Sequence, residues 1–126
     1  GVVAGIIHVE AMRAALRKFG PDMPLDGQHK RWGLENLNLD DEKLAEYGVL
    51  GMMQNVYTSC EDHTGGHRGK MAAWNGESFD LVSEDWIVSD LDVIWPLIYE
   101  RSEKYAAENN IKIRDCSNPE DNAYMY

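Results

Sequence analysis

The stretch Gly1–Pro24, GVVAGIIHVEAMRAALRKFGPDMP, decides how the first half of the chain folds. It predicts a helix from about Val2 to Phe19, followed by Gly20 in a left-handed capping conformation and then by a proline. Its polar residues recur three or four positions apart, at Glu10, Arg13 and Arg17. They leave a wide apolar surface, formed by Val3, Ile6, Ile7, Met12, Leu16 and Phe19. A surface of that width predicts packing neighbours on more than one side of the helix.

Two shorter helices are expected next. Asp26 is a cap for a helix through GQHKRWGLENL, and Asp40 is a cap for a helix in DDEKLAEYG that stops at Gly48. The side chains expected to turn inward from these helices are Trp32, Leu34, Leu37, Leu44 and Tyr47. The first half of the chain is therefore predicted to be helical.

The second half predicts one antiparallel hairpin and a closing helix. Asn75 and Gly76 favour a two-residue turn with positive φ at both positions, between arms at about 68–74 and 77–83. The closing helix is expected to begin between residues 92 and 96 and to run to about Asn109. Its expected buried stripe is Ile94, Ile98 and Tyr105.

Length and charge limit the class of protein. The 126 residues suffice for one compact domain, and 22 acidic against 12 basic residues give a formal net charge of -10. An acidic surface repels nucleic-acid phosphates, so nucleic acid is not an expected partner. No apolar run approaches the roughly 20 residues that span a bilayer. These properties predict a soluble protein.

The run CEDHTGGHRG, Cys60 to Gly69, contains the residue types of a metal site. Cys60, Asp62, His63 and His67 are all zinc-ligand types, and the two histidines are four residues apart. The two glycines between the histidines oppose a helix there, and no second ligand pair lies at suitable spacing elsewhere. We therefore expect no metal and no cofactor, and a glycine-rich connection into a strand.

Cys60 could alternatively be a nucleophile activated by His63 or His67. Its neighbours Glu61 and Asp62 are acidic, and adjacent negative charge disfavours a thiolate. We therefore expect no catalytic residue and no enzymatic activity. The other cysteine is Cys116, and the pair can form a disulfide or remain two free thiols. Composition alone leaves both states open.

The order of several phrases resembles a known family. The apolar first helix is followed by RWGLENL, by CEDHTGGHRG with its His67–Arg68 pair, by AAWNGESFDLVSEDW with a Trp-x-Gly turn, and by YERSEKYAAENN. Together they resemble the carboxy-terminal part of the type I periplasmic solute-binding proteins of ABC importers, in the branched-chain amino acid group. The resemblance spans about residues 2–111.

That resemblance implies a larger parent of two α/β lobes, of which this chain would be a fragment, mainly α with a short antiparallel hairpin. Residues 1–58 would be the helical part of the first lobe. Residues 59–111 would supply the crossover link, the hairpin and the closing helix of the second lobe. The polar tail, residues 112–126, has no counterpart in the family.

The resemblance also implies a function. The parent would be periplasmic, would capture a branched-chain or related amino acid or amide by lobe closure, and would present it to an ABC permease. No ligand-binding residue can be assigned within this chain. The fragment would self-associate, because its first helix would lack the sheet against which it packs. The alternatives are a small zinc- or thiol-dependent enzyme centred on Cys60, His63 and His67, or an acidic domain that binds a basic protein.

Overall fold

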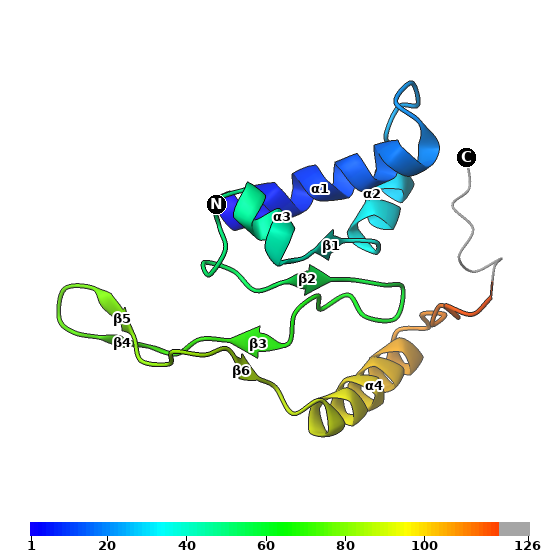
Figure 1. The fold of residues 1–126 in the computed structure, drawn as a ribbon. Helices are drawn as coiled ribbons and strands as arrows, with labels where there is room; N and C mark the ends of the chain where they lie inside the picture. The colour runs from blue at the N-terminus through cyan, green and yellow to red at the C-terminus, as the bar shows by residue number, and fades with distance from the viewer. Residues whose placement is uncertain (119–126) are drawn as a thin grey trace. The chain divides into compact units, whose positions relative to one another are not determined.

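The computed structural model describes residues 1–118 (Figure 1). Its elements are α1 (Val2–Phe19), α2 (Gly27–Leu34), β1 (Asn38–Leu39), α3 (Asp41–Glu46), β2 (Val56–Tyr57), β3 (Arg68–Gly69), β4 (Ala72–Trp74), β5 (Phe79–Leu81), β6 (Ile87–Val88) and α4 (Leu91–Glu108). The chain folds as two compact units. Unit 1 comprises Gly1–Gly66 and the segment from Asp115 onward, and unit 2 comprises His67–Arg114.

The first helix has the predicted limits, Val2 to Phe19. Its end is made by Gly20, whose N–H donates to the carbonyl oxygen of Leu16 at 3.0 Å. Gly20 has the expected positive φ of 103°, but its ψ of 153° is extended rather than left-handed helical. The chain therefore leaves α1 directly in an extended direction toward the proline, without a left-handed cap.

Small residues bring α1 and α2 close together. Ala11, Ala14 and Ala15 are buried on α1, and Gly33 is buried on α2. A Cβ added at Gly33 would lie 2.0 Å from the carbonyl oxygen of Ala11, which is far inside van der Waals contact. The helix contact therefore depends on the absence of a side chain at this position.

The hydrophobic core of unit 1 lies on the same side of α1 as the β1–β2 pair (Figure 1). Its buried cluster consists of Leu39, Leu44, Val49 and Met53. Val3, Ile6 and Ile7 of α1 pack against this cluster, together with Tyr47 and Val56. The inner face of α1 thus closes a core formed by segments that follow it in the chain.

The two predicted helix caps are confirmed. The Asp26 carboxylate accepts hydrogen bonds from the backbone N–H groups of Gln28 and His29, and the Asp40 carboxylate accepts from Lys43. The expectation that Leu34 turns inward is wrong, because this side chain at the end of α2 is exposed. Gly33 occupies the tight contact with α1 beside it, which turns its larger neighbour outward.

The predicted hairpin is present as β4 and β5, but its turn differs from the prediction. Trp74 and Phe79 are the last paired residues, so the turn has four residues, 75–78, rather than two. Gly76 has positive φ and Asn75 does not. The Asn75 side chain accepts from the N–H groups of Glu77 and Ser78, each at 2.8 Å. These bonds stabilise the longer turn without a left-handed asparagine.

The closing helix α4 begins one residue before the predicted range and ends next to the predicted residue. Its predicted buried stripe is wrong at Tyr105, which is exposed, whereas the adjacent Ala106 is buried. Ile94 and Ile98 are half-buried. The small side chain of Ala106 is therefore on the buried side of α4, and the large ring of Tyr105 is on the exposed side.

The structure divides the chain at other positions than the expected boundaries. The loop 59–66 belongs to unit 1, and so does the described part of the tail from Asp115. The described chain is rich in helices and adds three antiparallel strand pairs, β1–β2, β3–β6 and β4–β5. The two-lobed α/β fold of a longer parent stays a prediction.

Candidate functional site

The loop 59–66 is a compact turn held by its own hydrogen bonds. The Ser59 hydroxyl accepts from the N–H groups of Glu61 and Asp62, at 3.2 and 3.0 Å. The Asp62 carboxylate accepts from the N–H of Thr64 at 2.9 Å and from its hydroxyl at 2.5 Å. Gly65 has φ of +79°, and its carbonyl oxygen accepts from the N–H of Tyr57 in β2. The loop is therefore anchored to the β2 strand rather than extended.

The two cysteines are joined in this structure. The Cys60–Cys116 disulfide has an S–S distance of 2.01 Å and a Cα–Cα distance of 5.8 Å. Both residues belong to unit 1, whereas the chain between them includes all of unit 2. The disulfide therefore closes unit 1 around the point where the chain leaves and returns. It also leaves no thiolate at Cys60, so the thiol-nucleophile alternative does not fit this structure.

The two histidines of the run Cys60–Gly69 have different partners. His63 Nε2 lies 3.4 Å from Oε1 of Glu35, a buried carboxylate at the end of α2. His67 belongs to unit 2, where its ring packs edge-on against Trp95 with centroids 5.6 Å apart. Within residues 1–118, no three or more His, Cys, Asp or Glu side chains converge into a possible metal site. The zinc set of Cys60, Asp62, His63 and His67 is not assembled.

A buried carboxylate forms the polar centre of unit 1. Glu10 is 4% exposed, and its carboxylate accepts hydrogen bonds from the Tyr47 hydroxyl and from Arg13, the latter at 2.8 Å. Arg17 lies 4.0 Å from the second carboxylate oxygen, and Arg13 also contacts the Tyr47 hydroxyl. These contacts tie α1 to the end of α3.

The surroundings of Glu10 shift two pKa values in opposite directions. Burial raises the pKa of the Glu10 carboxyl, but the hydrogen bonds from Tyr47 and Arg13 and the charges of Arg13 and Arg17 lower it, and the net pKa lies below 4.5. The hydrogen bond to Glu10, together with burial, raises the pKa of Tyr47 above 10.0. The ionised Glu10 carboxylate is engaged by neighbouring donors, which suits a structural role better than proton transfer.

Sequence reasoning treated Glu10 as one member of the polar face of α1, and missed that it is buried. A signal was present in the spacing, since Arg13 and Arg17 follow this single acid of α1 at three and seven residues. A carboxylate that is followed by cations at three and seven residues has both cations on its own helix face, where they compensate its charge when it is buried. Tyr47 was expected to face inward, and it is half-buried against this group.

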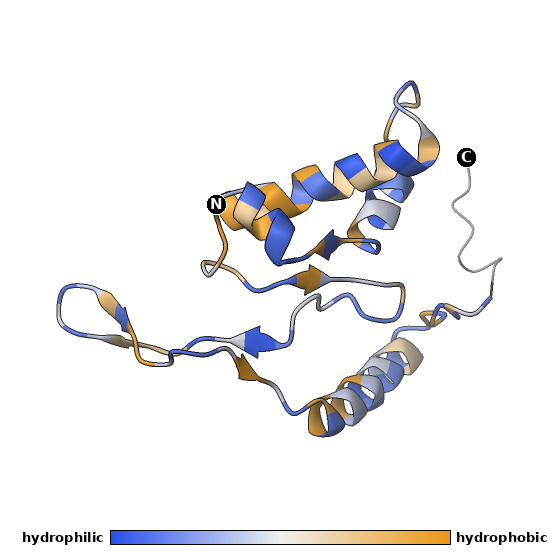
Figure 2. Ribbon diagram, in the orientation of Figure 1, coloured by the Kyte–Doolittle hydropathy of each residue, from blue (hydrophilic) through white to orange (hydrophobic). Residues whose placement is uncertain are grey.

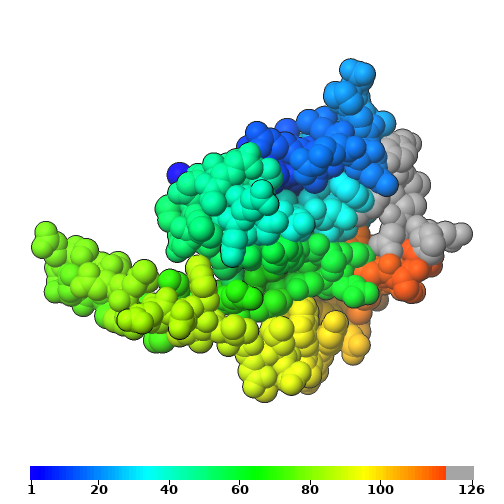
Figure 3. All heavy atoms as spheres, viewed as in Figure 1, coloured from blue at the N-terminus to red at the C-terminus, as the bar shows by residue number. Residues whose placement is uncertain are grey.

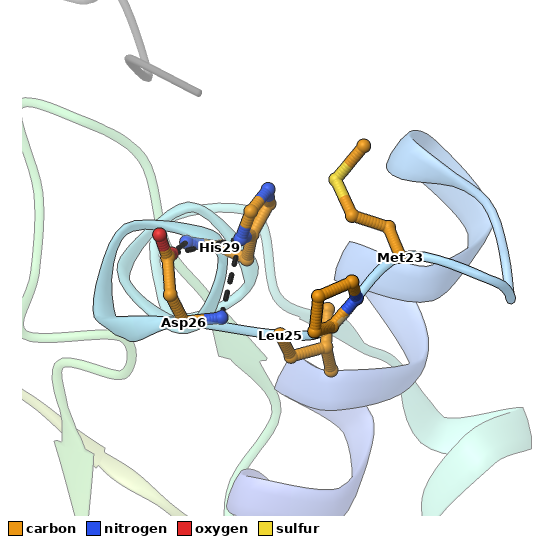
Figure 4. Close-up of a pocket in the computed structure, with 5 residues that line it drawn as sticks. Met23, Leu25, Asp26 and His29 are labelled. Atoms are coloured by element: carbon orange, nitrogen blue, oxygen red, sulfur yellow. Dashed lines mark hydrogen bonds and ion pairs between the residues drawn. The ribbon is translucent and has the colours of Figure 1, made fainter.

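An open pocket lies at the turn between α1 and α2 (Figure 4). It has a volume of about 370 Å³ and is lined by Met23, Pro24, Leu25, Asp26 and His29. The His29 ring forms part of its wall and also accepts from the N–H of Asp26 at 3.2 Å, which completes the cap of α2. The lining is mostly apolar, so the pocket can hold a small apolar group.

Three comparisons with known proteins bear on this chain. No protein-family model matches it, and no curated protein matches it. A solved structure described as an ABC transporter permease from the Pseudomonas fluorescens group matches with a TM-score of 0.82 and 43% sequence identity. The match covers 90% of this chain and 27% of that chain, so this chain spans about a quarter of the length of the protein it resembles.

This match corrects the family expected from the sequence phrases. The similar structure is described as a permease and not as a periplasmic solute-binding protein, so the expected family and the expected solute-binding function are wrong. The broader expectation of an association with ABC transporters is supported by the same match. Among residues 1–118, no helix is both long enough and apolar enough to cross a membrane.

Proposed function

We propose that this chain is a non-catalytic part of an ABC transporter component of the permease kind. The observation that carries the proposal is the 43% identity at a TM-score of 0.82 over 90% of the chain. Identity at that level over nearly the whole chain, together with the shared fold, supports a shared role within the transporter. The proposal concerns only the quarter of the similar protein that this chain matches.

The polar groups of unit 1 support a structural role within that component. Cys60 is bonded to Cys116, and Glu10 is engaged by Tyr47 and Arg13. His63 lies against Glu35. Each of these three groups connects one segment of unit 1 to another.

We further propose that this part of the component lies outside the cytoplasm. The support is the Cys60–Cys116 disulfide, because disulfides form and persist in oxidising compartments and are rare where glutathione keeps thiols reduced. An extracytoplasmic position is compatible with a transporter component, which has contacts on more than one side of a membrane.

Co-purification tests the transporter assignment. An affinity tag on the protein in its native host, followed by chemical crosslinking and detergent extraction, is expected to enrich an ATP-binding-cassette subunit. That subunit is identified in the mass spectra by peptides of its phosphate-binding loop. An untagged strain is the control. Enrichment of the tagged protein without any such subunit would contradict the proposal.

A further inference from the structure

Helix α1 has apolar residues on two opposite faces. The inner face packs on the core of unit 1 through Val3, Ile6 and Ile7, and on α2 through its alanines. A second set of residues, here named the outer stripe, recurs at alternating spacings of three and four: Val2, Gly5, Val9, Met12 and Leu16. Val9 of the stripe and Ala11 of the buried face are about 200° apart around the helix.

The outer stripe is open to solvent over most of its length. Val2 is 68% exposed, Val9 is 46% exposed and Met12 is 42% exposed, whereas Leu16 is half-buried. Figure 3 shows α1, in blue, reaching the surface of the molecule. Figure 2 shows hydrophobic colour along the N-terminal half of α1 and hydrophilic turns toward its C-terminal end. A row of exposed apolar residues along one helix face is a candidate interaction surface.

The spacing of the stripe fits a helical partner. Apolar residues that alternate at three and four positions form the seam along which two helices pack side by side. From Val2 to Leu16 the stripe is about 21 Å long, which is about four helical turns. Gly5 adds no side chain within the stripe and so permits close approach of a second backbone.

The positive charge beside the outer stripe favours a partner helix with acidic residues. Arg13 and Arg17 border the stripe, and both are paired with Glu10, the single acid of α1, so this edge has a net charge of +1 on a chain whose net charge is -10. Lys18 lies on the other side of the helix, over the Trp32 ring of α2. Glu10 is buried, whereas the side chains of Arg13 and Arg17 are 51% and 66% exposed. The first turn also has no acidic residue to offset the positive end of the helix dipole.

We infer that the outer stripe of α1 is the docking surface for an amphipathic helix of a partner protein, with apolar residues at the same spacing bordered by Asp and Glu. Such a helix would bury Val9 and Met12 and would place carboxylates beside Arg17. A second copy of α1 is a poorer occupant, because it would bring two basic helices together. The inference is independent of the transporter assignment.

Two designed peptides test this surface on the purified chain. Both are labelled 18-residue helices with leucine at alternating spacings of three and four, bordered by glutamate in one peptide and by lysine in the other. Fluorescence anisotropy is expected to show saturable binding of the glutamate peptide, at least tenfold tighter than the lysine peptide. The glutamate peptide should lose affinity as salt is raised.

Two variants locate the binding on α1. Val9→Asp should lower the affinity for the glutamate peptide at least tenfold. Val93→Asp, at an exposed position of α4, should leave this affinity unchanged. Arg17→Glu should reverse the preference between the two peptides. This variant leaves every residue of the outer stripe unchanged, so it tests the charge alone. Circular dichroism verifies that each variant is folded.

Three results would overturn the inference. One is equal affinity for both peptides, which would mean that charge does not select the partner. Another is unchanged binding by both Val9→Asp and Arg17→Glu. The third is a sedimentation equilibrium in which the chain alone dimerises and Val9→Asp returns it to a monomer, since the stripe would then be occupied by a second copy. The peptide assay contains no transporter subunit. Its result therefore does not depend on whether the co-purification succeeds.

Discussion

Gly33 of α2 lies directly against the backbone carbonyl of Ala11 in α1, so that a Cβ at this position would meet the carbonyl oxygen at 2.0 Å. Gly33→Ala should therefore force the two helices apart. Overpacking of this kind costs about 1–3 kcal/mol, and we expect a loss of that size in the free energy of unfolding, measured by denaturant titration.

Gly27→Ala is the matched control for this prediction. Gly27 begins the same helix, has no heavy atom within 4 Å of its added Cβ, and needs no positive φ. Alanine there should be neutral or stabilising by about 0.4–1 kcal/mol, through its effect on the unfolded chain. Equal stability of the Gly33→Ala and Gly27→Ala variants would contradict the tight contact between α1 and α2.

The Cys60–Cys116 disulfide should contribute strongly to stability. The two residues are 56 positions apart, and the chain-entropy model gives about 4 kcal/mol for a loop of this length. The double variant Cys60→Ser/Cys116→Ser should lose free energy of unfolding of this order, and reduction of the wild type should lower its stability by a similar amount.

Thiol titration tests the same bond without a variant. Unfolded, unreduced protein should show no reactive thiol, and a maleimide–polyethylene glycol reagent applied to intact cells after acid quenching should produce no shift in mass. Two adducts before reduction would show that the cysteines are free in the cell. That outcome would remove the support for an extracytoplasmic position.

Tyr47→Phe should change both the stability and its dependence on pH. The hydroxyl of Tyr47 donates to the buried Glu10 carboxylate, and loss of a donor to a buried charged group costs about 1–3 kcal/mol. The pKa of Glu10 is lowered in the folded protein, so the stabilisation is present above pH 4.5 and is lost as the pH falls through the folded pKa.

The difference in free energy of unfolding between wild type and Tyr47→Phe should therefore be largest near neutral pH and should shrink in acid. Denaturant titrations at about pH 7 and about pH 3 measure it. Tyr57→Phe is the control, because Tyr57 lies on β2 and is exposed. A difference that stays constant between the two pH values would show that the hydroxyl does not interact with the ionised carboxylate.

Thr58→Val should detach the strand β2 from the end of α2. The Thr58 hydroxyl accepts from the N–H of Leu37 at 2.9 Å and donates to the carbonyl oxygen of Leu34 at 2.6 Å. Valine has a similar shape but makes neither bond, so we expect a loss of about 1–3 kcal/mol. Hydrogen exchange at the Leu37 amide should accelerate in the variant. Thr58→Ser retains the hydroxyl and should keep most of the protection, and equal behaviour of the two variants would exclude the proposed hydrogen bonds.

Local features of both units could be predicted from the sequence because they depend on neighbouring residues. Asp26 and Asp40 cap their helices through bonds to N–H groups two or three residues away, and the limits of α1 follow from its apolar pattern and from Gly20. The turn at Asn75 was predicted in position but not in type. Side-chain bonds to Glu77 and Ser78 outweigh the usual preference of Asn–Gly for two residues.

The candidate site was predicted less well. Cys60, His63 and His67 are close in sequence, which suggested one centre, but a disulfide, a carboxylate on α2 and an aromatic ring in unit 2 draw them to different partners. The resemblance to a solute-binding family was based on the order and wording of short segments, none of which is a diagnostic motif. The solved structure that resembles the chain is described as a permease. A sequence pattern without a specific motif could not distinguish a permease from a solute-binding protein.

The sequence by itself determined the helix limits, the caps and the acidic balance of the chain, because these follow from interactions within a few residues and from composition. Only the tertiary structure decided which face of α1 is buried, that Gly33 must lack a side chain, and that Glu10 is enclosed by Tyr47. Those contacts join residues more than twenty positions apart. Their free energy depends on how the backbones approach each other, and a helical period of 3.6 residues specifies the faces of a helix without specifying what covers them.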